Sequence, residues 1–263
     1  MTRILRTKNH QPSETMDTIS EIARAFQSTM STFSSTSPMV RLQRGDFGIH
    51  HYKSILREVF HYTKEDPQMQ SLVTVYFRGA DRDTVKMFLK HATSEIGHEY
   101  LALNDLQSLG VDVSSVAESN PLPATMALTA FPFYQIVFRN PIGYLGYLYF
   151  LEFMPTQMGH IYAAALQRAG VPETALGFLT EHMSVDQAHN NLMFEYLKRL
   201  VHDRDDLDCI IYAMRVTGHL YSEMLCSAMN QAEMPLDFGF DPHERRRITR
   251  PLQPAGQKSG AVV

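Results

Sequence analysis

The chain is 263 residues long and carries a net charge of −4, with 44% hydrophobic and 20% charged residues. This composition is ordinary for a globular protein, and the charge gives no reason to expect a nucleic-acid partner. The length allows one large domain or two small ones, and it is sufficient to bury a sizeable core.

The first elements are a polar tail and one helix. Residues 1–17 lack the apolar stretch of a signal peptide and are expected to form a flexible tail. Thr18 and Glu21 have capping-box spacing, and apolar residues at helical spacing over 19–30 predict a helix. The Ser/Thr-rich run over 31–37 predicts a loop.

A second helix is predicted over 49–64, and it should stop before Pro67. Glu58 lies between apolar residues of this helix, which makes it a candidate for a buried acid. Taken by itself, Glu58 is better interpreted as a solvated carboxylate between Arg57 and His61.

A long helix is predicted next, from Asp81 or Asp83 to Gly110, after a helical turn over 71–76. One face of it carries Phe88, His91, Glu95, His98 and Ala102. The spacing of Glu95 and His98 lets a carboxylate and an imidazole reach one metal ion. This motif is weak alone, but its position on the apolar face strengthens it.

Residues 111–123 predict a loop, and two apolar helices follow over 124–138 and 142–169. Prolines and charges interrupt this apolar region, so it predicts a buried core and not a membrane span. Glu152 is the only charge between Arg139 and Arg168. A lone acid in such a helix is either neutral or paired with a cation or metal, and a hydrogen-bonded core acid is the structural alternative.

The most informative stretch lies in the helix predicted over 173–202. His182, Asp186 and His189 stand at i, i+4 and i+7, so they share a face that continues in apolar residues. A buried carboxylate needs a partner, and two imidazoles with one carboxylate form a ligand set suited to non-haem iron. The alternative is a structural His-Asp hydrogen bond with one surface histidine.

A last helix is predicted over 207–233, and residues 241–263 are expected to be a disordered tail. No strand pattern is found, so the chain is predicted to be all-α, with one metal-binding domain over 18–240. The two cysteines, Cys209 and Cys226, form neither a zinc spacing nor a disulfide framework, which favours a cytoplasmic location. Four helices offer inward-facing ligands, and their number suits two metal ions.

These motifs together resemble a known family. The run from Leu56 to Tyr62 is followed by His91-x3-Glu95-x2-His98, then by Leu151-Glu152, and finally by His182-x3-Asp186-x2-His189. Their order and spacing are similar to those of the haem-oxygenase-like diiron oxidases and oxygenases, often described as iron-containing redox enzymes and related in fold to thiaminase-type proteins. The similarity covers roughly residues 38–230.

The resemblance implies a bundle of about seven helices around a dinuclear iron site. Glu58, Glu95 and His98 would bind one iron. His182, Asp186 and His189 would bind the other, and Glu152 would bridge the two or bind the second. Many relatives carry a carboxylate where this chain has His91, so His91 is interpreted as a residue that supports the ligands.

The implied activity is O2-dependent oxidation by two Fe2+ ions through a peroxo-diiron intermediate. Such enzymes N-oxygenate amines, desaturate, or cleave C–C bonds of amino acids and fatty acids in specialised metabolism. An amino acid or amine is the expected substrate. Arg139, the only cation between Gly110 and Arg168, is a candidate to bind its carboxylate; a structural ion pair or cap is the alternative.

Two other functions remain open. A ferritin-like iron-binding protein would use Glu58-x-x-His61 together with Glu95-x-x-His98. A metal-free thiaminase-like hydrolase would need a nucleophilic cysteine near an acid. The expected partner is a small-molecule substrate, without nucleic acid or membrane, and a homodimer is left open.

Overall fold

The computed structural model describes residues 12–77 and 81–235, with the side chains of 17–77, 81–184 and 190–235. Within these residues the chain forms eleven α-helices and three short 3-10 helices, without strands. The all-α prediction is confirmed. The helices are more numerous than the seven expected, because several are short segments that join longer ones.

The elements follow one another along the chain with short links. They are α1 (Pro12–Ser34), α2 (Ser37–Arg44), α3 (Ile49–Thr63), α4 (Asp66–Val73), η1 (Thr74–Tyr76), α5 (Arg82–Glu95), α6 (Glu99–Ser108), α7 (Val113–Glu118), α8 (Pro123–Phe138), η2 (Pro141–Gly143), α9 (Tyr144–Arg168), η3 (Glu173–Ala175), α10 (Gly177–Leu200) and α11 (Arg204–Glu233).

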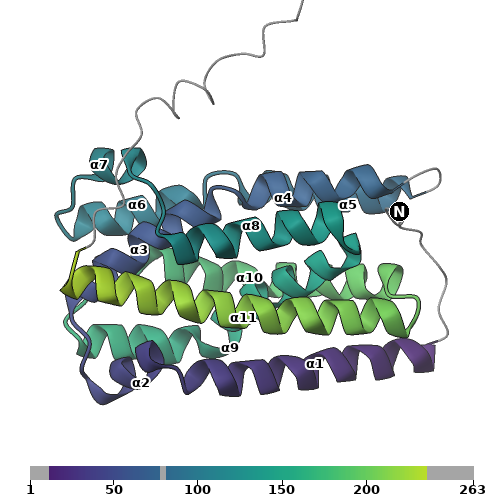
Figure 1. Ribbon diagram of the computed structural model, residues 1–263, viewed down its shortest axis with the longest axis horizontal. Coiled ribbons are helices and arrows are strands. Elements are labelled where there is room, and N and C mark those ends of the chain that lie inside the picture. The colour runs from purple at the N-terminus through teal and green to yellow at the C-terminus, as the bar shows by residue number, and fades with distance from the viewer. Residues whose placement is uncertain (1–11, 78–80, 236–263) are drawn as a thin grey trace, which may run out of the picture.

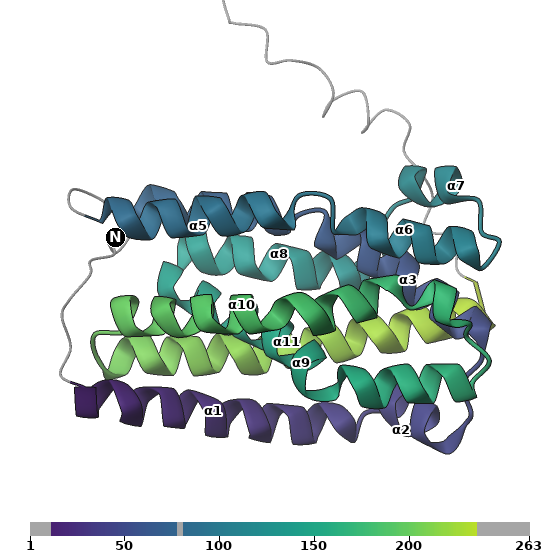
Figure 2. The same cartoon turned by 180° about the vertical axis from the view of Figure 1, so that it is seen from behind.

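The long helices lie side by side along the longest axis of the molecule. Helix α11 runs almost its full length, with α1 along one edge and α5 and α6 along the opposite edge (Figure 1). Helix α9 packs against both α10 and α11. Seen from behind, α5 and α6 follow each other end to end above α10 (Figure 2). Helices from distant parts of the sequence therefore face a shared interior.

Helix α1 is longer at both ends than the sequence predicts. It begins at Pro12 and continues through the Ser/Thr run to Ser34. The ring of Phe33 packs edge-on against Phe150 at a centroid distance of 5.9 Å, and Phe33 is buried. Burial of this aromatic ring outweighs the weak helix preference of the serines and threonines around it.

Helix α4 begins at Asp66, where the sequence analysis used Pro67 only as the stop signal of the preceding helix. Pro67 occupies the first turn of α4, where its missing N–H costs nothing. A new helix therefore starts at Asp66 and this proline, after a link of two residues that follows α3. As a result Asp66, which the sequence analysis did not single out, is the first residue of a helix that packs against α5.

The long helix predicted over 81–110 is broken in the middle. Helix α5 ends at Glu95, α6 begins at Glu99, and Gly97 between them has φ of +101°. Glycine adopts this left-handed region without the steric cost that a side chain imposes. The carboxylate of Glu99 accepts a hydrogen bond from the Gly97 N–H at 3.0 Å, which closes the break.

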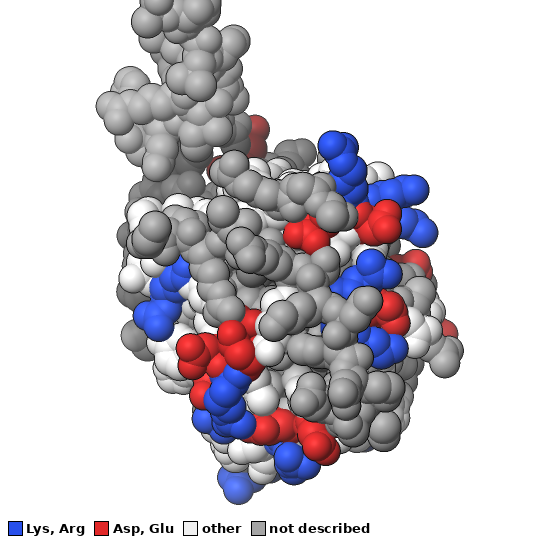
Figure 3. Space-filling view, turned by 90° about the vertical axis from the view of Figure 1, so that its right-hand side faces the viewer, with Lys and Arg blue, Asp and Glu red and all other residues white. Residues whose placement is uncertain are grey.

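Most of the two predicted tails falls outside the described residues. Residues 12–17, which the sequence analysis placed in the N-terminal tail, form the start of α1. Residues 1–11 and 236–263 lie outside the described part of the chain, so the rest of the two tails stays a prediction. No helix among the described residues is long and apolar enough to cross a membrane. On the coloured part of the face in Figure 3, acidic and basic side chains are interspersed.

Candidate metal centre

The break between α5 and α6 carries two of the predicted ligands. Glu95 is the last residue of α5, and His98 immediately precedes α6. His98 Nδ1 lies 2.9 Å from Glu95 Oε2. The two side chains therefore meet as predicted, although the single continuous helix expected to carry them is wrong.

A second pairing joins α5 to α9. His91 Nε2 lies 3.5 Å from Glu95 Oε1 and 3.2 Å from Glu152 Oε1. All three residues are buried, and Glu152 is the most exposed of them at 8%. Ligand atoms of His91, Glu95 and Glu152 all lie within 4.8 Å of one another, so they could hold one metal ion. His91, expected only to support the ligands, stands among them.

Helix α10 brings His182 to the other side of Glu95. Ligand atoms of Glu95, His98 and His182 also lie within 4.8 Å of one another. The Nδ1 of His182 is 2.7 Å from the Phe178 carbonyl oxygen. A carbonyl only accepts, so Nδ1 carries the proton and Nε2 keeps its lone pair for a metal. Glu95 is therefore common to two groups of three ligands.

Asp186 and His189 complete the predicted motif on α10, but their side chains lie outside the described residues. Their positions in the helix follow from the backbone. They stand four and seven residues after His182 in a continuous α-helix, and hence on the same face. Their roles as ligands stay a prediction.

The charges at this site compensate one another in the absence of metal. Burial lowers the pKa of His91, but contacts with Glu152 and Glu95 outweigh it and raise that pKa to about 9. For Glu95, burial acts in the opposite direction and raises the pKa. Hydrogen bonds with His91 and His98 outweigh burial and hold the pKa of Glu95 well below its usual range. Protons on imidazoles thus balance the carboxylates where metal cations would do so.

Two buried phenols lie near these acids. Tyr144 and Tyr196 are fully buried, and neither hydroxyl has a hydrogen-bond partner among the described residues. Burial raises the pKa of both, and the negative charge of Glu152 raises each further. A buried hydroxyl without a partner is costly, so both are suited to donate to a group bound at the centre.

The structure does not bring Glu58 into either ligand group. Its side chain is fully buried, and Oε2 accepts hydrogen bonds from the Leu122 N–H, at 2.9 Å, and from the Thr125 hydroxyl. Oε1 lies 3.0 Å from the Arg57 guanidinium. Glu58 therefore caps the N-terminus of α8, a structural role that the resemblance did not indicate.

Arg139 also lies apart from the centre. It is exposed and sits over the ring of Tyr212 at 5.4 Å, beyond the end of α8. A cation–π contact of this kind explains an arginine after an apolar segment without invoking a substrate.

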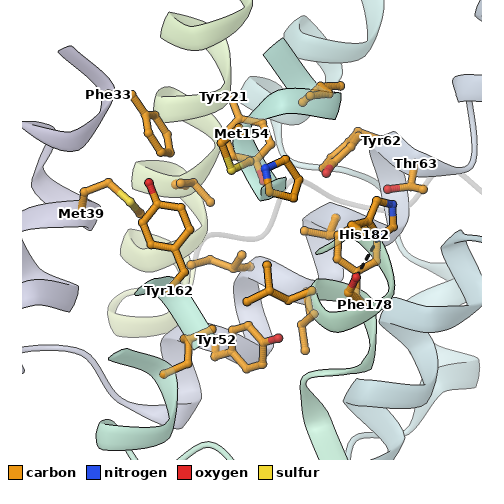
Figure 4. A pocket seen from close by; sticks show the side chains of 18 of the residues that line it. Phe33, Met39, Tyr52, Tyr62, Thr63, Met154, Tyr162, Phe178, His182 and Tyr221 are labelled. Carbon is orange, nitrogen blue, oxygen red and sulfur yellow. Dashed lines mark hydrogen bonds between the residues drawn. The ribbon is translucent and has the colours of Figure 1, made fainter. Parts of the chain in front are cut away.

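An apolar cavity leads to the metal centre. It has a volume of about 140 Å³ and is lined by 23 residues, among them Asp66, Glu95, Glu152 and His182. In Figure 4, His182 and Thr63 lie on one side of the cavity, and Phe33 and Met39 on the opposite side. No arginine or lysine of the described chain lines it.

Asp66 is an acid of this cavity that the sequence analysis missed, and it stands outside both groups of three possible ligands. It lines the cavity beside Glu95 and Glu152. Burial raises its pKa well above the usual range, and the nearby charge of Glu95 raises it further. One sequence feature could have drawn attention to Asp66: it directly precedes a proline, and proline is common at the first position of a helix. This feature predicts a helix start and gives no indication of a metal.

A helical bundle with two imidazole–carboxylate groups in its interior defines a class, the all-α proteins that can hold metal between their helices. The chain belongs to the iron-containing redox enzyme family, whose family model matches residues 53–221. The expected haem-oxygenase-like fold is thereby confirmed. No curated protein matches the sequence.

Solved structures show the same fold at low sequence identity. A domain of unknown function with a haem oxygenase-like fold from Shewanella denitrificans OS217 superposes with a TM-score of 0.74 at 23% identity, covering 86% of this chain and 97% of its own. A TenA homologue from P. horikoshii OT3 gives 0.67 at 11% identity, covering 81% and 98%. A TenA homologue from Pseudomonas syringae pv. tomato DC3000 gives 0.66 at 10%, covering 86% and 99%.

Proposed function

We propose that this chain is a non-haem diiron oxidase or oxygenase, which uses O2 to oxidise a small molecule. The observation that carries the proposal is the position of Glu95, whose two oxygens face two different groups of ligands. Two neighbouring metal ions could share such a carboxylate. Membership of the iron-containing redox enzyme family supports iron as the metal.

The chain's own residues divide into two sets around Glu95. His91 and Glu152 would hold one iron ion, and His98 and His182 the other. Asp186 and His189 would join His182 from the same face of α10. When bound, two Fe2+ ions supply the electrons and the open coordination positions for reaction with O2.

The surrounding side chains exclude water and orient what enters. The hydrogen bond to Phe178 fixes the ring of His182, so its free nitrogen stays directed away from that carbonyl. The hydroxyls of Tyr144 and Tyr196, which have no hydrogen-bond partner in the described part of the chain, could donate a hydrogen bond to a polar group held between these residues. The cavity is walled mainly by aliphatic and aromatic side chains, which keeps bulk solvent from the reacting groups.

The cavity narrows the expected class of substrate. Among the described residues it has no arginine or lysine to bind the carboxylate of an amino acid, and Arg139 lies elsewhere. Its lining favours a molecule with an apolar body whose single polar group, an amine or a carboxylic acid, is bound at the centre. N-oxygenation, desaturation and oxidative C–C cleavage are all compatible with such a molecule.

Metal analysis combined with a substrate panel tests this function. Protein expressed with added iron should contain about two irons per chain. O2 consumption should then respond to apolar amines or acids more than to polar amino acids of matched size. Many irons per chain would favour the ferritin-like alternative, and iron-free protein would contradict the proposal.

Because the fold is similar to that of the TenA homologues, the experiment should also test the metal-free hydrolase alternative. Neither Cys209 nor Cys226 lines the cavity that contains the acids. The Sγ of Cys209 accepts a hydrogen bond from the Gln135 amide at 3.3 Å, near the link between α8 and α9. A metal-free protein that hydrolyses thiamine-like compounds would nevertheless replace the diiron proposal.

A further inference from the structure

A third carboxylate faces the same cavity as Glu95 and Glu152. Asp66 opens α4, which packs against α5, the helix that carries His91 and Glu95. Its carboxyl group is near enough for the charges of Glu95, Glu152 and His91 all to affect it. Three acids and the imidazole of His91 therefore share one poorly hydrated space, in which a metal cation could take the place of the protons that now balance the carboxylates.

One buried side chain holds Asp66 in place. The hydroxyl of Tyr147, which is 1% exposed on α9, donates a hydrogen bond to Asp66 Oδ1 at 3.0 Å. No lysine or arginine among the described residues forms an ion pair with Asp66. Tyr147 is the one hydrogen-bond partner of the Asp66 carboxylate among the described residues, and Asp66 lines the cavity. A metal-binding carboxylate is characteristically oriented by a hydrogen bond of this kind.

Glu58 cannot serve in its stead without a rearrangement, because its two oxygens already contact Arg57, Leu122 and Thr125. We propose that Asp66, not Glu58, is the remaining carboxylate ligand of the metal centre, and that Tyr147 is its positioning residue. This inference rests on the proposed function. With Glu95, Glu152 and Asp186 it brings the carboxylates to four, which matches the charge of two Fe2+ ions.

Anaerobic titration with ferrous iron tests the proposal. The full-length chain is stripped with a chelator, and both iron stoichiometry and affinity are measured by competition against a chromophoric chelator. Asp66→Asn keeps the shape of the side chain and removes its charge. Glu58→Gln is the matched control, because it makes the same change at a buried acid that caps a helix. Tyr147→Phe removes only the hydrogen bond to Asp66.

The unchanged chain should bind two irons. Asp66→Asn should weaken one of them by ~10-fold or more, and Tyr147→Phe should weaken the same iron less. Glu58→Gln should keep both irons and lower the melting temperature. Two irons in Asp66→Asn, bound within about twofold of the unchanged affinity, would overturn the role of Asp66 and leave the diiron proposal standing.

Two further outcomes are decisive. If the unchanged chain binds no iron, the diiron function fails and the role of Asp66 fails with it. If Asp66→Asn does not fold, Asp66→Glu keeps the charge. Mössbauer spectra of its two irons should then differ from those of the unchanged chain at one iron. Identical spectra would contradict the proposal.

Discussion

Asp105 on α6 accepts a hydrogen bond from the backbone N–H of Gly177 at 2.8 Å, and a second from Phe178 at 2.9 Å. It thus caps α10 from another helix, at the end nearest His182. A Cβ at Gly177 would stand only 2.8 Å from Asp105 Oδ1, so a larger residue there would force this carboxylate to shift. The start of α10 at Gly177, later than the predicted residue 173, follows from this contact.

Asp105→Ala should therefore affect both stability and metal binding. Loss of a helix cap costs ~1–2 kcal/mol, which corresponds to a fall in melting temperature of about 2–8 °C. Because His182 lies in the second turn of α10, iron affinity should also fall. Asp112→Ala is the control, since Asp112 caps the short helix α7 through Ser114. Normal iron binding in Asp105→Ala would show that the cap does not position His182.

The two ligands predicted at the C-terminal side of His182 can be tested separately. Asp186→Ala or His189→Ala should each remove one iron and leave the helical circular dichroism signal nearly unchanged. His160→Ala provides the control, because His160 is an exposed histidine on α9. If either variant retained two irons and full activity, the motif on α10 would have to be structural.

The metal-free protein should lose stability as the pH rises above neutrality. The pKa of His91 is raised to about 9 by Glu152 and Glu95 against the effect of burial. A raised histidine pKa stabilises the fold fully below the unfolded value of about 6.5, and this stabilisation is lost as the pH passes 9. Melting temperatures in a chelator, measured from pH 7 to 9.5, should fall more steeply than in His91→Asn.

Iron affinity should have the opposite pH dependence. A bound imidazole must be neutral, so Fe2+ has to displace the proton that His91 holds below pH 9. Affinity measured by chelator competition should increase between pH 6.5 and 8.5. A flat profile would indicate that His91 is not displaced from its pairing with Glu95 and Glu152.

Arg139→Lys is expected to leave substrate affinity unchanged, in contrast to the sequence-based hypothesis. The guanidinium lies over Tyr212, outside the cavity lining, so no contact with a substrate is lost. The measurement is the concentration dependence of substrate-triggered O2 consumption. A ~10-fold weaker substrate affinity, the size expected for a lost bidentate contact, would indicate that Arg139 does bind the substrate.

The far end of the cavity should limit the size of the substrate. Leu42 lines the cavity from α2, which also carries Met39 on the side opposite His182 (Figure 4), and Leu42→Phe would reduce the available space. Turnover of the longest active compounds in a homologous series should fall by ~10-fold while that of shorter ones is retained. Leu103→Phe on α6 is a control, because Leu103 is partly buried outside the cavity lining.

The sequence predicted most of the side chains that meet in the interior of the bundle, because they repeat at helical spacing. Glu95, His98, Glu152 and His182 meet as the apolar faces of their helices indicate. Such periodicity reports which side of a helix is buried, and burial is what brings ligands together.

Other features depend on contacts that periodicity does not encode. Gly97 breaks the helix at the site, yet a single glycine inside a helical pattern is often tolerated. Glu58 was buried as the resemblance required, but its burial serves α8. Asp66 stood outside the predicted helices, because Pro67 was interpreted as an end and not as a beginning.

Asp66, Glu95 and Glu152 line one cavity, and this should make the abundance of the protein in a cell depend on the supply of metal. A ligand that binds only the folded chain stabilises it by mass action, and iron bound among these acids would add this stabilisation to the folded chain. The iron-free chain should therefore open more often and be digested faster by proteases. Its abundance is expected to fall when iron is scarce, even if its synthesis continues unchanged.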